Sequence, residues 1–143
     1  IGDTLILLGD FSVGSGSGSL KMDKMAAYEH YRRKIACNNI IYIRGNHSLS
    51  LDKLAKLGIF NEVYDYYELR QKSRMIVMFH YPILSWNGMS LGSYMLHGHL
   101  HSNRVYGRSM DVGLDSNNFK PYKLDDAINF LSTQPILTEG HHA

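Results

Sequence analysis

Short apolar runs that end in polar residues alternate with amphipathic stretches along the first half of the chain. Continuous apolar runs at 4–8 and 40–43 predict buried β-strands, because a strand covered on both faces carries apolar side chains at successive positions. Apolar residues at helical spacing, mixed with charged ones, predict helices over 20–37 and 50–57, the second with Ser50 as its N-cap. This alternation of strands and helices indicates an α/β fold.

The second half of the chain contains shorter apolar runs and predicts mainly strands. Segments 63–69 and 74–79 have the composition of two strands joined by a tight turn, which predicts a hairpin. Further strands are predicted at 94–96 and 109–112, and a final amphipathic helix at 124–131. The sheet of this half therefore combines a hairpin with later strands.

The 143 residues contain no internal repeat and no linker that divides them, although alternating glycine and serine at 14–19 are typical of a surface loop. Hydrophobic residues make up 44% of the chain and charged residues 20%, which is normal for a folded protein and excludes a disordered or fibrous one. We therefore predict a single domain over 1–143. A chain of this length builds a core without disulfides or metal, so a metal ion in this protein would be functional.

The formal net charge of +2 is too small to indicate a nucleic-acid or membrane partner. The single cysteine, Cys37, forms no disulfide within the chain, and no apolar run reaches the length of a membrane-spanning helix. We therefore expect a cytoplasmic protein that acts away from membranes. The unusual feature of the composition is histidine, since three of the eight histidines lie between positions 97 and 101.

Side chains that bind metals follow four predicted strands at the point where each strand ends. They are Asp10, the pair Asn46 and His47, His80, and the pair His99 and His101. The carboxyl ends of strands are where open α/β sheets build their sites. Carboxylate and amide oxygens with imidazole nitrogens suit manganese, iron, zinc or nickel, and without thiolates nothing favours Cu(I) or an iron–sulfur cluster.

The sequence blocks that contain these residues resemble the calcineurin-like metallophosphoesterase family. The family motifs Gly-Asp, Gly-Asn-His, a later His and Gly-His-x-His stand in this chain, in the family's order, as Gly9-Asp10, Gly45-Asn-His47, His80 and Gly98-His-Leu-His101. Segments 2–4, 85–88 and 120–124 are similar to small single-domain phosphoesterases of bacteria and phages. The resemblance implies an α/β/β/α arrangement, a β-sandwich of two mixed sheets flanked by helices.

The resemblance also implies a dinuclear metal centre and a metal-bound hydroxide that attacks a phosphoric ester. Asp10 would bridge the two ions, and His47 would protonate the leaving group as general acid. The other implied ligands are Asn46, His80 and His99 at one ion and His101 at the second. Manganese is the metal that we expect, with iron, zinc and nickel as the other candidates.

Two departures from the family pattern qualify these roles. The family's first block, Asp-x-His, is absent from this sequence, so we expect that block and its strand to precede Ile1 in a complete protein. The domain over 1–143 would then be N-terminally incomplete and would hold one ion tightly instead of two. In addition, Ser48 stands where the family carries an acidic residue that orients the general-acid histidine, so His47 needs another partner.

Four further assignments concern the substrate. Asn46 is a candidate substrate contact as well as a ligand. Arg44 either forms an ion pair or contacts the phosphate. Trp86 is either a core anchor or a surface that stacks on a base. His97 either packs at the end of its strand or lines the site.

The sequence therefore predicts a metal-dependent hydrolase of phosphoric esters, with diester and monoester substrates both open. One alternative is a degenerate or truncated relative that binds metal and phosphate without turnover, which the missing Asp-x-His block supports. A second is a nuclease or cyclic-nucleotide phosphodiesterase, in which Trp86 and Tyr81 would stack on a base. The expected partner is a small phosphate ester or nucleotide, and the near-neutral charge does not favour long nucleic acid.

Overall fold

The computed structural model describes residues 2–12 and 23–138, which form two compact units. Unit 1 ends at Asp65 and unit 2 begins at Tyr66. The predicted loop at 14–19 and the first three residues of the predicted helix 20–37 lie outside the described residues.

Unit 1 contains a parallel three-stranded sheet. Its strands are β1 (Thr4–Gly9), β2 (Asn39–Arg44) and β3 (Glu62–Tyr64), in the order β1-β2-β3. The register pairs Gly9 with Arg44, so β1 and β2 end side by side. The residues that follow these two strands therefore leave the sheet at the same edge.

Helix α1 (Lys24–Arg33) begins where Asp23 caps it. The Asp23 backbone is extended, and its carboxylate accepts a hydrogen bond of 2.9 Å from the amide of Ala26. The described helix lies inside the predicted range 20–37, and Lys34 ends it before the predicted end at Cys37.

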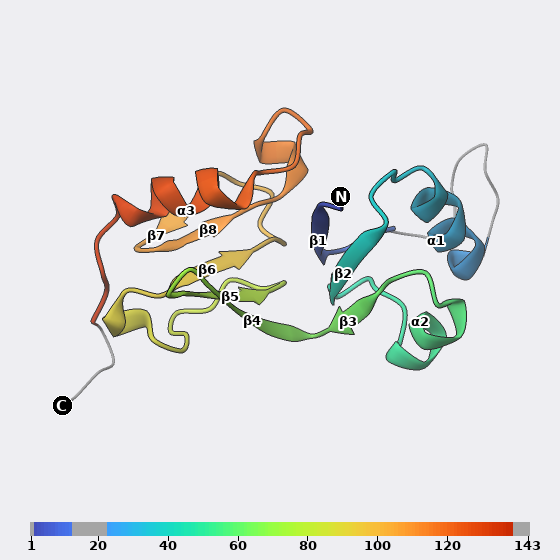
Figure 1. The fold of residues 1–143 in the computed structure, drawn as a ribbon, viewed down its shortest axis with the longest axis horizontal. Helices are drawn as coiled ribbons and strands as arrows, with labels where there is room; N and C mark the ends of the chain where they lie inside the picture. The colour runs from blue at the N-terminus through green and yellow to red at the C-terminus, as the bar shows by residue number, and fades with distance from the viewer. Residues whose placement is uncertain (1, 13–22, 139–143) are drawn as a thin grey trace. The chain divides into compact units, whose positions relative to one another are not determined.

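Helix α2 (Leu51–Leu57) has the predicted boundaries. The Ser50 hydroxyl accepts from the amide of Lys53 at its start, and Gly58 ends it in the left-handed conformation, with φ of 59°. Both helices lie on the same side of the three strands (Figure 1). They pack with β2 on one aromatic core whose buried residues are Tyr28, Tyr42, Leu49 and Leu54.

Unit 2 contains a mixed five-stranded sheet in the order β4-β5-β6-β8-β7. The strands are β4 (Tyr66–Gln71), β5 (Arg74–Phe79), β6 (Tyr94–His97), β7 (Val105–Tyr106) and β8 (Ser109–Asp111). The two edge pairs, β4-β5 and β7-β8, are antiparallel, whereas β5, β6 and β8 run parallel. The three central strands therefore end at one edge of this sheet.

The predicted hairpin is confirmed, with a turn in which Lys72 and Ser73 both have positive φ, at 50° and 61°. The single strand predicted at 63–69 is wrong, because the chain leaves one sheet and enters the other within it. Asp65 separates β3 from β4, and its carboxylate pairs with Arg44 instead of pointing into a strand face.

Helix α3 (Leu124–Ser132) lies along β6, β7 and β8 and buries Ala127, Ile128 and Leu131 (Figure 1). A second cluster packs Val77 and Met95 against residues of the 81–93 segment, which contains the short 3-10 helix Met89–Leu91. The sheets and their flanking helices confirm the predicted α/β class. Among the residues described, no helix combines the length and apolarity needed to cross a bilayer.

Candidate metal centre

Asp10 is placed by the turn that ends β1. Gly9 has φ of 112°, a conformation that favours glycine, and turns the chain out of the sheet before the carboxylate. The half-buried Asp10 accepts a hydrogen bond of 2.8 Å at Oδ1 from the amide of His47. The end of β1 is thus fastened to the turn that follows β2.

Gly45 makes this close approach possible. A Cβ atom on Gly45 would lie 2.2 Å from Asp10 Oδ1 and 2.8 Å from the Asp10 amide nitrogen, which is closer than any real Cβ contact. Only glycine therefore fits at this position. The next two residues, Asn46 and His47, are exposed on the turn beside the carboxylate.

A network of hydroxyl groups stabilises the turn that follows β2. The amide of Gly45 donates to Ser48 Oγ at 2.7 Å, and Ser48 Oγ lies 2.5 Å from the hydroxyl of Tyr42. The Tyr42 hydroxyl lies 3.2 Å from that of Tyr28, which accepts from the amide of Leu49. Burial raises the pKa of Tyr42 far above its ordinary value, so the Tyr42 hydroxyl keeps its proton. Ser48, at the position of the family's acidic residue, is thus part of the turn.

His47 is fastened through its backbone. Its amide donates to Asp10, and its carbonyl oxygen accepts from Nζ of Lys24, the first residue of α1. The imidazole itself is on the exposed side of the turn. These contacts therefore fix the backbone of His47 and leave its imidazole ring accessible.

Arg44 forms the ion pair that was one of its two predicted roles. Its Nε and Nη2 donate to the two oxygens of Asp65 at 2.7 and 2.9 Å, and Nη1 donates to the carbonyl of Leu49. The hydrogen bonds from Arg44 lower the pKa of Asp65 below its ordinary value. This pairing occupies the edge of the guanidinium that a phosphate would use.

Unit 2 brings His80 and His99 together. His80 follows β5 and is 3% exposed, and His99 follows β6 in the Gly98–His101 loop. The centroids of the two imidazole rings are 5.0 Å apart, and the ring of Tyr81 lies 4.8 Å from that of His99. The amide of Gly98 donates to the carbonyl of His80 at 3.0 Å and ties the two strand ends together.

The histidine loop has an unusual backbone. His99 and His101 have φ of 72° and 51°, a left-handed conformation that costs a non-glycine residue about 1–2 kcal/mol. Between them the amide of Leu100 donates to Asp111 Oδ2 at 3.2 Å, while Asp111 Oδ1 accepts from Gly113 at 2.7 Å. Asp111, 2% exposed at the end of β8, therefore joins two loops.

Two carboxylates near this loop were not among the predicted site residues. Asp111 lies inside the strand predicted at 109–112, although an acidic residue at the end of an apolar run is itself a signal. The second is Asp115, whose Oδ2 lies 2.5 Å from Nδ1 of His101. No local sequence feature announces this pair, because its members are fourteen positions apart in the chain.

Two of the proposed substrate contacts lie in the core of unit 2. His97 is buried, and its Nδ1 lies 3.0 Å from the carbonyl oxygen of Gly98. Trp86 is 6% exposed, packs in the cluster with Val77 and Met95, and has its Nε1 3.4 Å from the carbonyl oxygen of Ser93. For both residues the structure favours the packing alternative over substrate contact.

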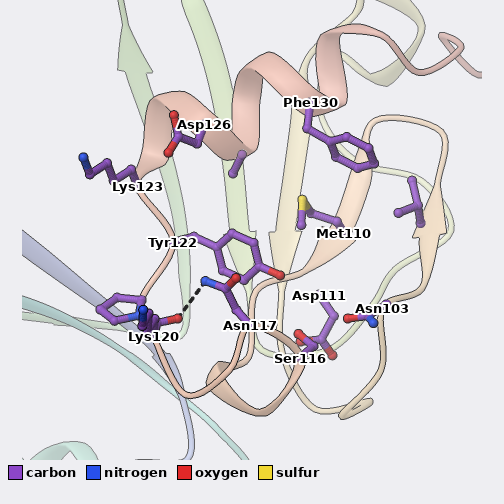
Figure 2. A pocket seen from close by; sticks show the side chains of 13 residues that line it. Asn103, Met110, Asp111, Ser116, Asn117, Lys120, Tyr122, Lys123, Asp126 and Phe130 are labelled. Atoms are coloured by element: carbon purple, nitrogen blue, oxygen red, sulfur yellow. Dashed lines mark hydrogen bonds between the residues drawn. The ribbon is translucent and has the colours of Figure 1, made fainter.

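A hollow of about 590 Å³ opens in unit 2 between β8, α3 and the segment that joins them. Figure 2 shows Tyr122 in the middle of it, Lys120 and Lys123 on one side, and Phe130 and Met110 beneath the helix. Asn117 donates to the carbonyl of Lys120 and holds that side of the rim. Since Asp111 is also among the lining residues, the hollow begins beside the histidine loop.

The predicted ligands thus form two groups, Asp10 with Asn46 in unit 1 and His80 with His99 in unit 2. Within residues 2–12 and 23–138, the structure contains no cluster of three or more His, Cys, Asp or Glu side chains arranged to hold a metal. The donor types of the two groups, oxygen in one and imidazole in the other, are types that divalent transition metals bind, and each group contributes two of the predicted ligands. The glycine cradle at Gly45 also fits, because it leaves space for an acceptor group instead of a side chain.

Comparisons with known proteins agree with these motifs. The family model for calcineurin-like phosphoesterases matches residues 2–143 and confirms the resemblance found in the sequence. A crystal structure of a protein of unknown function from Aquifex aeolicus is similar, with a TM-score of 0.62 and 23% identity over 90% of this chain and 76% of that one. This likeness supports the fold alone. No match was found among curated proteins.

Proposed function

We propose that this chain, which belongs to the calcineurin-like phosphoesterase family, is a metal-dependent hydrolase of phosphoric esters. The observation that carries the proposal is the position of Asp10, whose carboxylate lies against Gly45 and accepts the His47 amide. This contact joins the Gly-Asp motif of the family to its Gly-Asn-His motif. The His47 amide and the space at Gly45 fix the position of this carboxylate at the end of β1, where the motif places a metal ligand.

We assign Asp10, Asn46, His80 and His99 to one divalent ion, and Asp10 with His101 to a second. When bound, such a pair of ions neutralises phosphoryl oxygens and activates a water molecule as nucleophile. Contacts within the chain hold several of these donor residues in place. Asp10 has two oxygens and is held at Oδ1, and the Gly98–His101 loop carries its two histidines on a backbone fixed by Asp111. Manganese is the metal that we propose.

His47 is the proposed general acid. Its backbone is held at the amide by Asp10 and at the carbonyl by Lys24, so the imidazole projects from a fixed point next to the ligand Asn46. A proton donor in this place would protonate the leaving oxygen of the ester. Because Ser48 is engaged with Gly45 and Tyr42, we expect the partner of the imidazole to come from elsewhere.

The proposed substrate is a small phosphate ester. The hollow in unit 2 has the size for a small organic group, and its lining combines the cationic groups of Lys120 and Lys123 with the carboxylates of Asp111 and Asp126. We assign the phosphate to the side of the hollow that carries the two lysines. Tyr122 and Phe130 offer aromatic surface for the organic part of the ester. A net charge of only +2 gives long nucleic acid little general attraction.

One observation favours a second candidate, a protein that binds metal and phosphate without turnover. In the family, the residue at the position of Ser48 orients the general acid. Here the Ser48 hydroxyl contacts Gly45 and Tyr42 and stabilises the turn instead. A chain without that orientation would retain its ligands and lose rate. Both candidates bind metal, so turnover is the property that separates them.

The test is release of the aryl alcohol from an activated phosphodiester, bis(4-nitrophenyl) phosphate, with and without Mn²⁺. It is run on the chain over 1–143 and on a form extended by any residues that its gene encodes before Ile1. Hydrolysis that requires Mn²⁺ and is lost in Asp10→Asn, but not in the exposed control Asp52→Asn, supports the hydrolase. Metal binding by both forms without hydrolysis by either would establish the second candidate instead.

A further inference from the structure

We propose that Asp115 is a positioning residue that selects which nitrogen of His101 binds metal, an inference that rests on the proposed function. The pair joins Asp115 Oδ2 and His101 Nδ1 at 2.5 Å. A carboxylate at this distance accepts the Nδ1 proton, so the lone pair of the neutral ring lies on Nε2. Asp115 would thus present Nε2 to the ion.

The surroundings of His101 explain why such a contact is needed. Its side chain is 77% exposed, and its backbone has φ of 51° at the end of the strained histidine loop. An exposed imidazole on such a loop has several rotamers and two neutral tautomers available. One carboxylate contact at Nδ1 reduces both the rotamers and the tautomers.

The position of Asp115 is itself built by the fold. It lies in the short 3-10 helix Leu114–Ser116, and Gly113 directly precedes this helix. A Cβ atom on Gly113 would lie 2.8 Å from Asp115 Oδ1 and 3.0 Å from Asp111 Oδ1. Gly113 therefore leaves space for two carboxylates at once, and one of them reaches the amide of Leu100 while the other reaches the ring of His101.

A His101 ring held in this way would bind an ion as part of a carboxylate–histidine pair. A ligating imidazole binds through a nitrogen without a proton, and a carboxylate on its other nitrogen fixes that tautomer and raises the donor strength of the ring. Loss of such a partner commonly weakens metal binding by about 10–100-fold. Asp115 acts only through His101 in this proposal, and it touches neither ion nor substrate.

The first test reads the tautomer without metal or turnover. Long-range ¹H–¹⁵N NMR of the metal-free full chain, at about pH 8 where ordinary imidazoles are neutral, reports which ring nitrogen of His101 carries the proton. We expect the Nδ1–H form in the wild type and in the exposed control Asp52→Asn, and a mixture or the Nε2–H form in Asp115→Leu. A wild-type ring that carries its proton on Nε2, or one unchanged by Asp115→Leu, overturns the proposal.

The second test measures binding of Mn²⁺ by calorimetry in the same variants. We expect affinity for the second ion, which we assign to Asp10 and His101, to fall about 10–100-fold in Asp115→Leu and to stay unchanged in Asp52→Asn. Asp115→Asn, which keeps an acceptor oxygen, should recover part of the loss and also serves if the leucine variant does not fold. Unchanged affinity in both variants contradicts the proposal. If tautomer and affinity respond while no ester is hydrolysed, the positioning role stands and the proposed hydrolase fails.

Discussion

The amide of His47 donates to Oδ1 of Asp10 at 2.8 Å, across the ends of two parallel strands that the register places side by side. This contact joins the family's Gly-Asp block to its Gly-Asn-His block. It depends on Gly45, whose missing side chain leaves the space that the carboxylate occupies. Three residues in two motifs thus form one structural arrangement.

The first prediction concerns Gly45→Ala. The added Cβ would displace the Asp10 carboxylate, so we expect weaker Mn²⁺ binding and a loss of about 1–3 kcal/mol in the free energy of unfolding. Calorimetric titration with Mn²⁺ and urea denaturation measure the two effects. The matched control is Gly2→Ala, since a Cβ there meets no atom within 4 Å. Equal metal affinity in wild type and Gly45→Ala would remove Asp10 from the ligand set.

The hydroxyl network beneath the turn gives a second prediction. Ser48→Ala leaves the amide of Gly45 without its acceptor, so we expect a loss of about 1–3 kcal/mol in the free energy of unfolding. Tyr42→Phe removes the hydroxyl that Ser48 contacts, and the double variant should lose less than the sum of the two single losses. Urea denaturation of the four proteins measures the coupling. Additive losses would show that the two residues act independently.

A third prediction follows from the ion pair of Arg44 and Asp65. Arg44 holds the pKa of Asp65 below its ordinary 3.8, so below about pH 4 the unfolded chain takes up a proton that the folded chain still refuses. The stabilisation is therefore complete above that pH and is lost as the pH falls through the folded pKa. Because Asp65 is 54% exposed, it amounts to about 1 kcal/mol or less.

The variant Asp65→Asn tests this pH dependence. We expect it to be less stable than wild type at pH 7 and to approach wild-type stability as the pH falls below 4, as measured by urea denaturation across that range. Asp52→Asn, on the exposed first turn of α2, is the control. A stability difference that stays constant down to pH 3 would mean that the effect is not the ion pair.

The fourth prediction concerns His47→Gln. We expect metal content to stay unchanged and turnover of esters with poor leaving groups to fall about 10²–10⁴-fold, the usual reach of general acid catalysis. Activated aryl esters, whose leaving groups need little protonation, should lose much less. Steady-state rates on both substrate types make the comparison. Equal losses would indicate that His47 positions the phosphate, and a loss of metal would make it a ligand.

The ligand candidates were predictable because they depend on local patterns. Asp10, Asn46 and His80 each follow an apolar run, and a strand end is visible in the sequence as the place where that run stops. Ser50 and Gly58 likewise announce a helix start and end through their own backbone preferences. These features need no information about distant parts of the chain.

The features that could not be predicted from the sequence depend on distant partners. Asp65 lies between β3 and β4, and its carboxylate forms an ion pair with Arg44 of β2. Asp111 and Asp115 fix the histidine loop from the far end of β8 and from a short helix beyond it. Local composition cannot show that these acidic residues reach a loop that lies well before them in the chain.

The central claim is that residues from the family's motifs hold a metal ion, and anomalous diffraction from crystals of the Mn²⁺-loaded chain tests it most directly. We predict a strong manganese peak ligated by Asp10, Asn46, His80 and His99. A peak bound by other residues, or His80 and His99 directed away from the ion that Asp10 binds, would contradict this claim.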